Sequence, residues 1–413
     1  MTDAALATPT AESHRTQLEA LSQKLQVELQ RHLPESRELR HRLHADPRAS
    51  GDESDTARTV AEALRGVLDL STVADVGLVG RIGPEGPAVG LRAELDALPV
   101  KEKTGADFAA MNGAMHACGH DVHMAALVAL SKAAAGLKLP VALAPVFQPR
   151  EEAYPSGAEQ IVDEGVLRRF GIAQMAAAHV HPAVAPGSVA VGSGYINAAA
   201  DEISIRLDGQ GGHGAYPHHG FDTVTAISQI AIGLQETLRR TVSPMNPAVI
   251  SVGTLAAGEG AANVLPKHAH LLAIMRTVTA EDRTSLFEAV RSLAEGTAAA
   301  YGLTAEVTLT MGEPVLDNDE RLATSTEHWV KSMGLDVDEP MRSLGADDFS
   351  FFCQEIPSLM TFVGIDLDEA TSSQVSLHDP EFLPTEHSVG HVAHALLAAY
   401  LGGAERILED RRV

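Results

Sequence analysis

Residues 115–123, Met-His-Ala-Cys-Gly-His-Asp-Val-His, concentrate the side chains that bind metal ions best in proteins. Cys118 and His120 are separated by one glycine, which leaves the backbone free to turn a thiolate and an imidazole towards one centre. This combination favours zinc-like ions, and a nearby carboxylate widens the choice to manganese or cobalt. The alternative is a plain helix start, in which Asp121 caps a buried helix over 122–135. We expect both the helix and a metal site.

Acidic pairs follow two other apolar segments. Glu151 and Glu152 are adjacent, so in a loop one carboxylate can bind a metal ion while its neighbour transfers protons. Asp96 and Glu94 come after an earlier apolar segment and can orient a ligand imidazole from behind. The alternatives are an exposed acidic pair at a strand end for the glutamates, and a turn or helix cap for the other two.

Histidines outside the central motif are weaker candidates. His179 and His181 end a third apolar segment, and on a continued strand both side chains face the same way. His378 lies in Ser-Leu-His-Asp-Pro and gains weight only from the other candidates. A single histidine is more often structural than functional, so His179 is a ligand candidate only because Cys118, His120 and Glu152 are also present.

The second half of the chain offers candidates for substrate binding. His213 lies in a glycine-rich loop that permits close approach of a ligand, although the same composition suits a simple turn. Asn263 and Arg276 can hold a carboxylate, and Arg276 suits a surface ion pair equally well. Cys118 as a catalytic nucleophile is a further alternative, but a metal thiolate explains its histidine neighbours better.

Composition excludes several classes of protein. The 413 residues allow two or three domains, and the net charge of -24 makes nucleic acid and anionic membranes poor partners. With two cysteines we expect no disulfide framework and a reducing, cytoplasmic location. The chain has no secretory signal pattern at its start, no membrane-spanning apolar run, and no P-loop or G-x-G-x-x-G for a nucleotide.

Helices and strands alternate over the first half of the chain. A leucine pattern predicts a helix over about 12–32 that Pro34 ends, and the arginine-rich run after it, 37–42, is expected to be a solvated helix face. The other predicted elements are helices over 54–68, 121–135 and 156–170 and strands over 76–82, 89–91, 140–147 and 173–178. The candidate residues therefore follow the C-terminal ends of three strands, where open α/β sheets place their sites.

A different pattern begins after residue 197. Strand, helix, strand, strand, helix and strand follow in turn, which is the order of a ferredoxin-like unit. We therefore predict an α/β protein in which residues 1–197 and 313–413 form one domain with a mixed central sheet flanked by helices. Residues 198–312 form a ferredoxin-like α+β domain inserted into it.

Taken together, these segments resemble the aminoacylase-like metallo-amidohydrolases of the M20 peptidase family. The similarity is to the branch that holds N-acyl-amino-acid, hippurate and indoleacetyl-amino-acid hydrolases. The matching segments run in order from residue 43 to 382: LHADP, LRAELDALP, MHACGHDVH, FQPREE, HVHP, GGHGAYPH, NVLP, GADDFSFF and LHDPEF. Glu94 departs from the aspartate that the family often has, and Ala153–Ser156 lacks the usual glycine run. These departures bear on acyl specificity.

The resemblance implies a di-metal catalytic domain and a lid domain that mediates dimerisation. It implies five metal ligands, namely Cys118, His120, Glu152, His179 and His378, with Cys118 bridging two divalent ions. The ions would be Zn²⁺ or Mn²⁺, with Co²⁺ and Ni²⁺ as further candidates. Glu151 would be the general base and Asp96 would support the ligands. His213 and Asn263 would bind substrate or stabilise the oxyanion, and His213 would reach the site of a partner subunit.

The expected function is hydrolysis of the amide bond that joins an acyl or aryl-acyl group to an amino acid. The expected partners are a small N-acyl amino acid and a second copy of the chain. Two alternatives stay open: a metallo-dipeptidase or aminopeptidase, which needs a free substrate amine, and a non-catalytic metal-binding homologue. The pair Glu151 and Glu152 argues against the last, because a pure binder needs no second carboxylate beside a ligand.

Overall fold

The computed structural model describes residues 11–258, 260–367 and 375–411, which divide into two compact units. Unit 1 takes its residues from 1–194, 317–341 and 351–413, and unit 2 takes its residues from 195–316 and 342–350. Unit 2 is therefore slightly wider than the predicted insertion and gains a segment, 342–350, that we had expected in the other domain. The start of the chain, on which the expectation of no secretory signal rests, lies outside the described residues.

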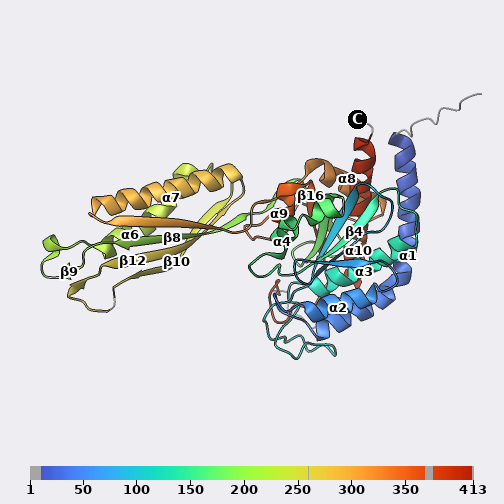
Figure 1. Cartoon of the computed structure of the whole chain (residues 1–413), viewed down its shortest axis with the longest axis horizontal. Helices are drawn as coiled ribbons and strands as arrows, with labels where there is room; N and C mark the ends of the chain where they lie inside the picture. The colour runs from blue at the N-terminus through green and yellow to red at the C-terminus, as the bar shows by residue number, and fades with distance from the viewer. Residues whose placement is uncertain (1–10, 259, 368–374, 412–413) are drawn as a thin grey trace, which may run out of the picture. The chain divides into compact units, whose positions relative to one another are not determined.

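Unit 1 is built on one eight-stranded mixed sheet (Figure 1). Its four central strands run parallel: β4 (Ala142–Gln148), β3 (Ala88–Glu94), β5 (Ile172–His181) and β16 (Ser358–Gly364). The outer strands are β1 (Leu70–Val73) and β2 (Gly77–Gly80) on one side and β6 (Val189–Ala190) and β15 (Val337–Asp338) on the other. The central strands are buried almost throughout, which explains their nearly continuous apolar sequences. The predicted α/β class with a mixed sheet is confirmed.

Helices cover this sheet. Those of the first half are α1 (Ala11–Ala45), α2 (Ser54–Ala63), α3 (His120–Ala135), α4 (Gly157–Asp163) and α5 (Val166–Arg169). Those of the second half are α8 (Glu320–Ser332), α9 (Ser350–Glu355) and α10 (His387–Asp410). Both α3 and α10 pack against central strands, and α1 packs against α3 and α10. Helix α3 connects the parallel strands β3 and β4, so its first residues lie where β3 ends.

Pro34 does not end the first helix, contrary to our prediction. It lies inside α1, and the apolar stripe continues across it because Leu29, Leu33 and Leu39 are all buried. A proline inside a helix costs about 3 kcal/mol, whereas each buried leucine contributes about 2 kcal/mol, so the stripe outweighs the missing hydrogen bond. The helix predicted over 156–170 is in fact the two short helices α4 and α5, which Gly165 separates with a φ of +66°.

Unit 2 has a four-stranded antiparallel sheet with two helices. Its strands lie in the order β10 (Ala248–Ala257), β12 (His268–Thr277), β8 (Ala199–Asp208) and β13 (Thr304–Met311). Helices α6 (Thr223–Thr241) and α7 (Ala280–Ala300) pack against it, which is the arrangement of a ferredoxin-like unit. Residues 203, 205 and 207 of β8 are buried and alternate with more exposed ones, as the sequence predicts. The remaining short elements are β7 (Gly194–Asn197), β9 (Gly212–His213), η1 (Pro217–His219), β11 (Val264–Leu265) and β14 (Leu316–Asn318).

Candidate metal centre

The turn that carries Cys118 and His120 depends on the glycine between them. Gly119 has a φ of +83°, a left-handed conformation that other residues rarely adopt. A Cβ atom at this position would lie 2.4 Å from Cγ2 of Val180 on β5, so only glycine permits this close approach. Helix α3 begins directly after it at His120, with Gly119 as the N-cap residue. The prediction that Asp121 caps this helix is therefore wrong.

The five predicted ligands all lie in unit 1, and the structure brings their donor atoms together. One atom each of Cys118, Glu152 and His378 lies within 4.8 Å of the other two, and the same holds for His120, Glu151 and Glu152. His179 joins them, because its Nε2 lies 3.4 Å from Sγ of Cys118. Glu151 and Glu152 follow the end of β4, and His179 lies inside β5, which continues past the predicted strand end. Cys118 and His120 lie at the start of α3, and His378 lies in the segment after β16.

Two of the histidines are held in the form that a metal ligand needs. Nδ1 of His120 lies 2.9 Å from the carbonyl oxygen of Asp96, and Nδ1 of His179 lies 2.7 Å from that of Val180. A carbonyl only accepts hydrogen bonds, so each Nδ1 carries the proton and each Nε2 keeps a lone pair. Nε2 of His120 is buried and has no hydrogen-bond partner among the described residues. This orphaned acceptor, beside a thiol and carboxylates, fits a bound cation.

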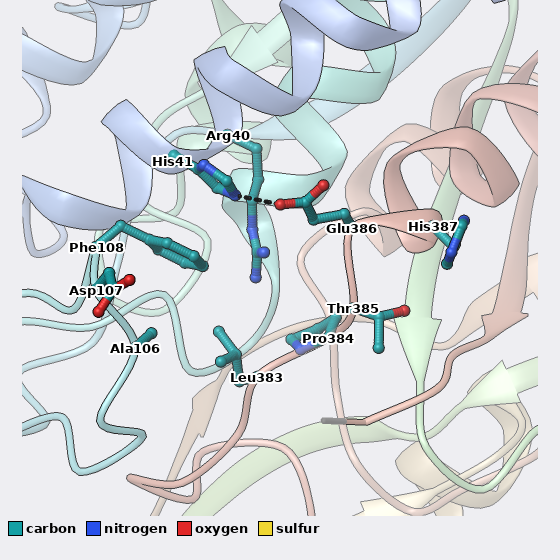
Figure 2. Close-up of a pocket in the computed structure, with 10 residues that line it drawn as sticks. All are labelled: Arg40, His41, Ala106, Asp107, Phe108, Leu383, Pro384, Thr385, Glu386 and His387. Atoms are coloured by element: carbon teal, nitrogen blue, oxygen red, sulfur yellow. Dashed lines mark ion pairs between the residues drawn. The ribbon is translucent and has the colours of Figure 1, made fainter. Parts of the chain in front are cut away.

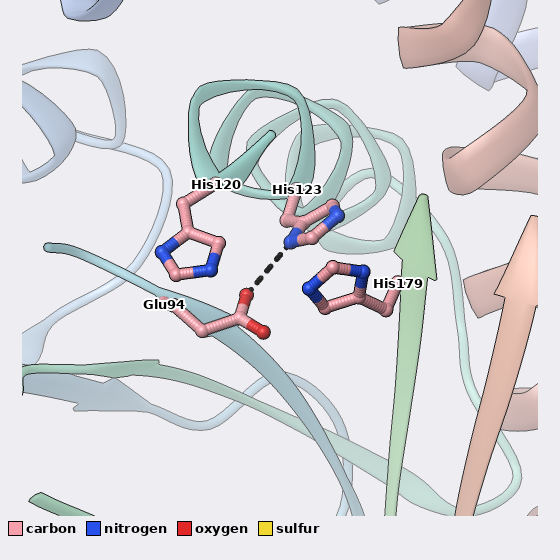
Figure 3. Close-up of side chains that lie close together, drawn as sticks. All are labelled: Glu94, His120, His123 and His179. Atoms are coloured by element: carbon pink, nitrogen blue, oxygen red, sulfur yellow. Dashed lines mark hydrogen bonds and ion pairs between the residues drawn. The ribbon is translucent and has the colours of Figure 1, made fainter. Parts of the chain in front are cut away.

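His123 lies beside these ligands but is engaged elsewhere (Figure 3). Its Nδ1 donates to a carboxylate oxygen of Glu94 at 2.8 Å, and its Nε2 accepts from the backbone N–H of Val180 at 3.0 Å. With both ring nitrogens bonded, His123 has no lone pair for a metal ion. Glu94 also pairs with Arg92, so its longer side chain serves two partners inside unit 1. The sequence did not single out His123, because its partners Glu94 and Val180 are distant in the chain.

Burial and charge fix the protonation states of the centre. Burial, together with the nearby His123 and His120 rings, holds the pKa of His179 well below its usual value, so this imidazole is neutral. Burial alone would raise the pKa of Glu152, but the hydrogen bond with His378 and the nearby His120 ring outweigh it and lower this pKa. A neutral imidazole and an ionised carboxylate are the forms that bind divalent cations.

The two adjacent glutamates occupy different positions. Glu152 lies with one carboxylate oxygen 3.2 Å from Nε2 of His378, whereas Glu151 has an oxygen 3.9 Å from Nε2 of His120. Oδ2 of Asp96 accepts the backbone N–H of Glu152 at 2.9 Å, so Asp96 contacts both the turn of the glutamates and, through its carbonyl, His120. The alternatives of an exposed acidic pair and of a simple turn do not describe these residues, which are largely buried.

A buried charged network lies behind the His120 turn. Asp121 accepts hydrogen bonds from Nε of Arg40 at 2.7 Å and from Nδ1 of His44 at 2.8 Å, and Nε2 of His44 lies 3.1 Å from Glu102. The prediction of a solvated arginine-rich face is therefore wrong for Arg40, which is 1% exposed. The four-residue spacing of Arg40 and His44, next to the buried leucines 39 and 43, was the signal that places them on the inner face.

Arg40 also borders a cavity of about 800 Å³ (Figure 2). The ring of Phe108 stacks on His41, and His41 forms an ion pair with Glu386 at 3.1 Å. None of the five candidate metal ligands lines this cavity. The residues that line this cavity are therefore different from the candidate metal ligands.

The substrate-binding candidates are in unit 2 and do not converge there. His213 pairs with Val264 across β9 and β11, and the N–H of Gly214 donates to the carbonyl of Asn263 at 2.7 Å, so His213 and Asn263 are neighbours. Strand β12 begins at His268, and Arg276 lies eight residues further along it. In an extended strand these two residues are about 27 Å apart. No ion pair involves Arg276 among the described residues, and its Nη1 is buried without a hydrogen-bond partner there.

A buried set of thiolate, imidazole and carboxylate donors, with a further carboxylate beside it, defines a centre of the kind that metal-dependent hydrolases use. Comparison with known proteins identifies the family. Residues 90–399 match Peptidase family M20/M25/M40, so the chain belongs to this family and the resemblance noted in the sequence is confirmed. It is a metal-dependent amide-bond hydrolase, as its relatives are named for amide hydrolysis.

Three relatives illustrate the similarity. N-acetyl-L-cysteine deacetylase of Bacillus subtilis is 32% identical over 381 residues, 90% of this chain and 88% of the relative. N-acetyldiaminopimelate deacetylase of Exiguobacterium sibiricum is 31% identical over 369 residues, 87% of this chain and 96% of the relative. The crystal structure of a dinuclear metal-binding M20 peptidase from Bacillus subtilis superposes with a TM-score of 0.78 at 28% identity, covering 92% of this chain and 99% of that one. A centre for two divalent cations is thus supported for this chain.

One further solved structure shares the fold alone. A tripeptidase from Staphylococcus aureus has a TM-score of 0.66 at 17% identity and covers 92% of this chain and 99% of its own. Within the described part of the chain, no helix combines the length and the apolar character that crossing a membrane would require.

Proposed function

We propose that this protein hydrolyses small N-acyl amino acids, releasing a carboxylic acid and the free amino acid. The observation that carries the proposal is the separation of the two adjacent glutamates, Glu152 towards His378 and Glu151 towards His120. In metal-assisted hydrolysis of an amide, one carboxylate can bind a cation while the other transfers protons, and the geometry of this turn suits such a division. The names of the deacetylases that match the chain support the same substrate class.

The donor set indicates how the cations are held. We assign them to Cys118, His120, Glu152, His179 and His378. Cys118 would be able to share the two ions, because its Sγ lies near Nε2 of His179 and also belongs to the group of Glu152 and His378. Mixed sulfur, nitrogen and oxygen donors suit Zn²⁺ or Mn²⁺, with Co²⁺ and Ni²⁺ as further candidates.

When bound, divalent cations of this kind lower the pKa of water and polarise an amide carbonyl. The protein's own residues then manage the protons. Glu151, which is 11% exposed, takes a proton from the attacking water onto a carboxylate oxygen and passes it to the leaving amine nitrogen. Asp96 keeps the proton of His120 on Nδ1 through its carbonyl and holds the Glu151–Glu152 turn through its carboxylate. Both roles follow from hydrogen bonds already formed in this chain.

Unit 2 would serve as a lid and as the surface of a homodimer. His213 and Asn263 are far along the sheet from Arg276, so a single amino-acid-sized substrate cannot touch both ends of unit 2 of one copy. Two copies resolve this, if one contributes Arg276 and the other contributes His213 and Asn263 to each site. Edge strand β10 supports such pairing, because it exposes Val252 and Leu255 and has a strand on one side only.

Complementation tests the shared site. When the inactive variants Glu151→Gln and His213→Ala are co-expressed, half of the dimers are mixed and each mixed dimer holds one intact site. Activity should then return to about a quarter of the wild-type value, because both defects fall in the same site. If the co-expressed variants are no more active than either variant alone, His213 does not contribute to the partner's site.

The substrate class is tested with a panel that crosses acyl groups with amino acids, assayed after loading with Mn²⁺, Zn²⁺ or Co²⁺. Release of free amino acid that stops with a chelator and returns with metal is the expected result. A metallo-dipeptidase or aminopeptidase would instead cleave only substrates with a free amine, and a non-catalytic homologue would cleave none. A cytoplasmic location fits the two cysteines, neither of which forms a disulfide.

A further inference from the structure

Glu53 has an unusual position for a charged side chain. It is 1% exposed and occupies the N-cap position of α2, yet its carboxylate makes no capping hydrogen bond to that helix. Instead Oε1 accepts the backbone N–H of Gly51 at 2.8 Å and that of Arg150 at 2.9 Å. The second contact joins residues 97 positions apart and ends one residue before Glu151.

Arg150 needs such support. Its φ is +49°, in the left-handed region that arginine rarely adopts. Its side chain is also held, because Nε donates to the carbonyl of Pro155 at 3.1 Å and Nη2 donates to Gln160. These contacts hold the backbone of Arg150 in one conformation immediately before Glu151 and Glu152.

The backbone N–H of Glu152, on the other side of Glu151, is also held, and Ser50 from the segment before Glu53 takes part. Oδ2 of Asp96 accepts the N–H of Glu152 at 2.9 Å and the hydroxyl of Ser50 at 2.7 Å. The backbone N–H groups on both sides of Glu151 therefore end on buried carboxylates. One of these carboxylates belongs to Glu53. The other belongs to Asp96, which is oriented by Ser50, three residues before Glu53.

We infer that Glu53, assisted by Ser50, is a positioning residue that aims the Glu151 carboxylate by holding the N–H groups on either side of it. This inference rests on the proposed function of Glu151 as the proton-transferring group. Glu53 acts through one acceptor oxygen, so a glutamine at this position keeps the contact to Arg150 and an alanine removes it. The negative charge of Glu53 is not required for this role.

Three variants test the inference: Glu53→Ala, Glu53→Gln and, as matched control, Glu62→Ala, which removes an exposed carboxylate from the same helix. With a substrate that the wild type cleaves, Glu53→Ala should lower kcat by about 30- to 100-fold and change KM by less than threefold, with both metal ions retained. Glu53→Gln should stay within about threefold of the wild type, and Glu62→Ala should equal it. Equal losses in the alanine and glutamine variants, or metal loss in proportion to activity, would overturn the positioning role.

A second measurement does not depend on turnover. Hydrogen exchange of peptides that cover 147–156 should accelerate in Glu53→Ala and stay at the wild-type rate in Glu53→Gln. If Glu53→Ala is too unstable to purify, Ser50→Ala should accelerate exchange at the same peptides and lower kcat several-fold. Unchanged exchange in Glu53→Ala, or in Ser50→Ala where that variant replaces it, refutes the inference even if hydrolysis is observed. A wild type that cleaves no N-acyl amino acid refutes the proposed function instead.

Discussion

Sγ of Cys118 lies 3.4 Å from Nε2 of His179, although the two residues are 61 positions apart in the chain. The contact exists because Gly119 lets the start of α3 approach β5 closely, where any Cβ would collide with Val180. The same strand supplies the carbonyl of Val180 that holds the His179 proton on Nδ1. Val180 thus takes part in two contacts: its side chain packs against Gly119, and its carbonyl sets the tautomer of His179.

Replacing Cys118 should reduce metal content. Cys118→Ala removes the thiol that lies 3.4 Å from His179, so we expect fewer than two metal ions per chain by elemental analysis, with a matching loss of hydrolysis. The matched control is Cys353→Ala, which changes the other cysteine and should bind metal as the wild type does. Unchanged stoichiometry in Cys118→Ala would exclude the thiolate as a ligand.

Glu151 should be needed for turnover but not for metal binding. Glu151→Gln keeps the size of the side chain and removes its ability to take a proton, so kcat should fall by about 10²- to 10⁴-fold while metal content stays the same. Glu159→Gln, an exposed glutamate in the first turn of α4, serves as the control and should be fully active. Retained turnover in Glu151→Gln would remove Glu151 as the base.

His123 and His120 should behave differently although both begin α3. His120→Asn removes an Nε2 that has no hydrogen-bond partner among the described residues, and it should lower metal content, whereas His123 has both nitrogens bonded to protein groups. His123→Asn should therefore keep both metal ions and lose stability, by about 1–3 kcal/mol, because buried Glu94 and the N–H of Val180 lose their partners. Metal loss in His123→Asn equal to that in His120→Asn would show that His123 is a ligand.

Much of this arrangement could be predicted from sequence because chemistry and periodicity coincide in it. The β/α alternation placed residues 96, 151 and 179 after separate parallel strands, and such ends meet at one edge of a sheet. The ferredoxin-like order of unit 2 followed from alternation alone. Both are properties of local sequence, so neither required knowledge of distant contacts.

The rest depended on contacts that no local pattern contains. Arg40 looked like a solvated residue until Asp121, 81 positions away, provided its partner. The sequence did not single out Glu53, because its partner, the N–H of Arg150, lies 97 positions away. Pro34 was expected to end a helix because its local cost was visible, whereas the leucines that compensate act only once α1 packs. Long-range pairing decided each of these cases.

His44 should make stability depend on pH above neutrality. Burial alone would lower its pKa, but the charge and hydrogen bond of Asp121 and the hydrogen bond to Glu102 outweigh it and raise the pKa to about 9. Because the unfolded value is about 6.5, this stabilisation is fully present below pH 6.5 and is lost as the pH rises towards 9. The total effect is about 3 kcal/mol at 1.36 kcal/mol per pKa unit.

The comparison of the wild type with His44→Gln isolates this contribution. Urea unfolding of the metal-free proteins between pH 6.5 and pH 9 should show the wild type's advantage over His44→Gln shrinking as the pH rises, because glutamine does not titrate. His328→Gln, an exposed histidine on α8, should keep the pH slope of the wild type. A difference between the wild type and His44→Gln that is constant across this range would mean that His44 is already neutral, and that Asp121 is balanced by Arg40 alone.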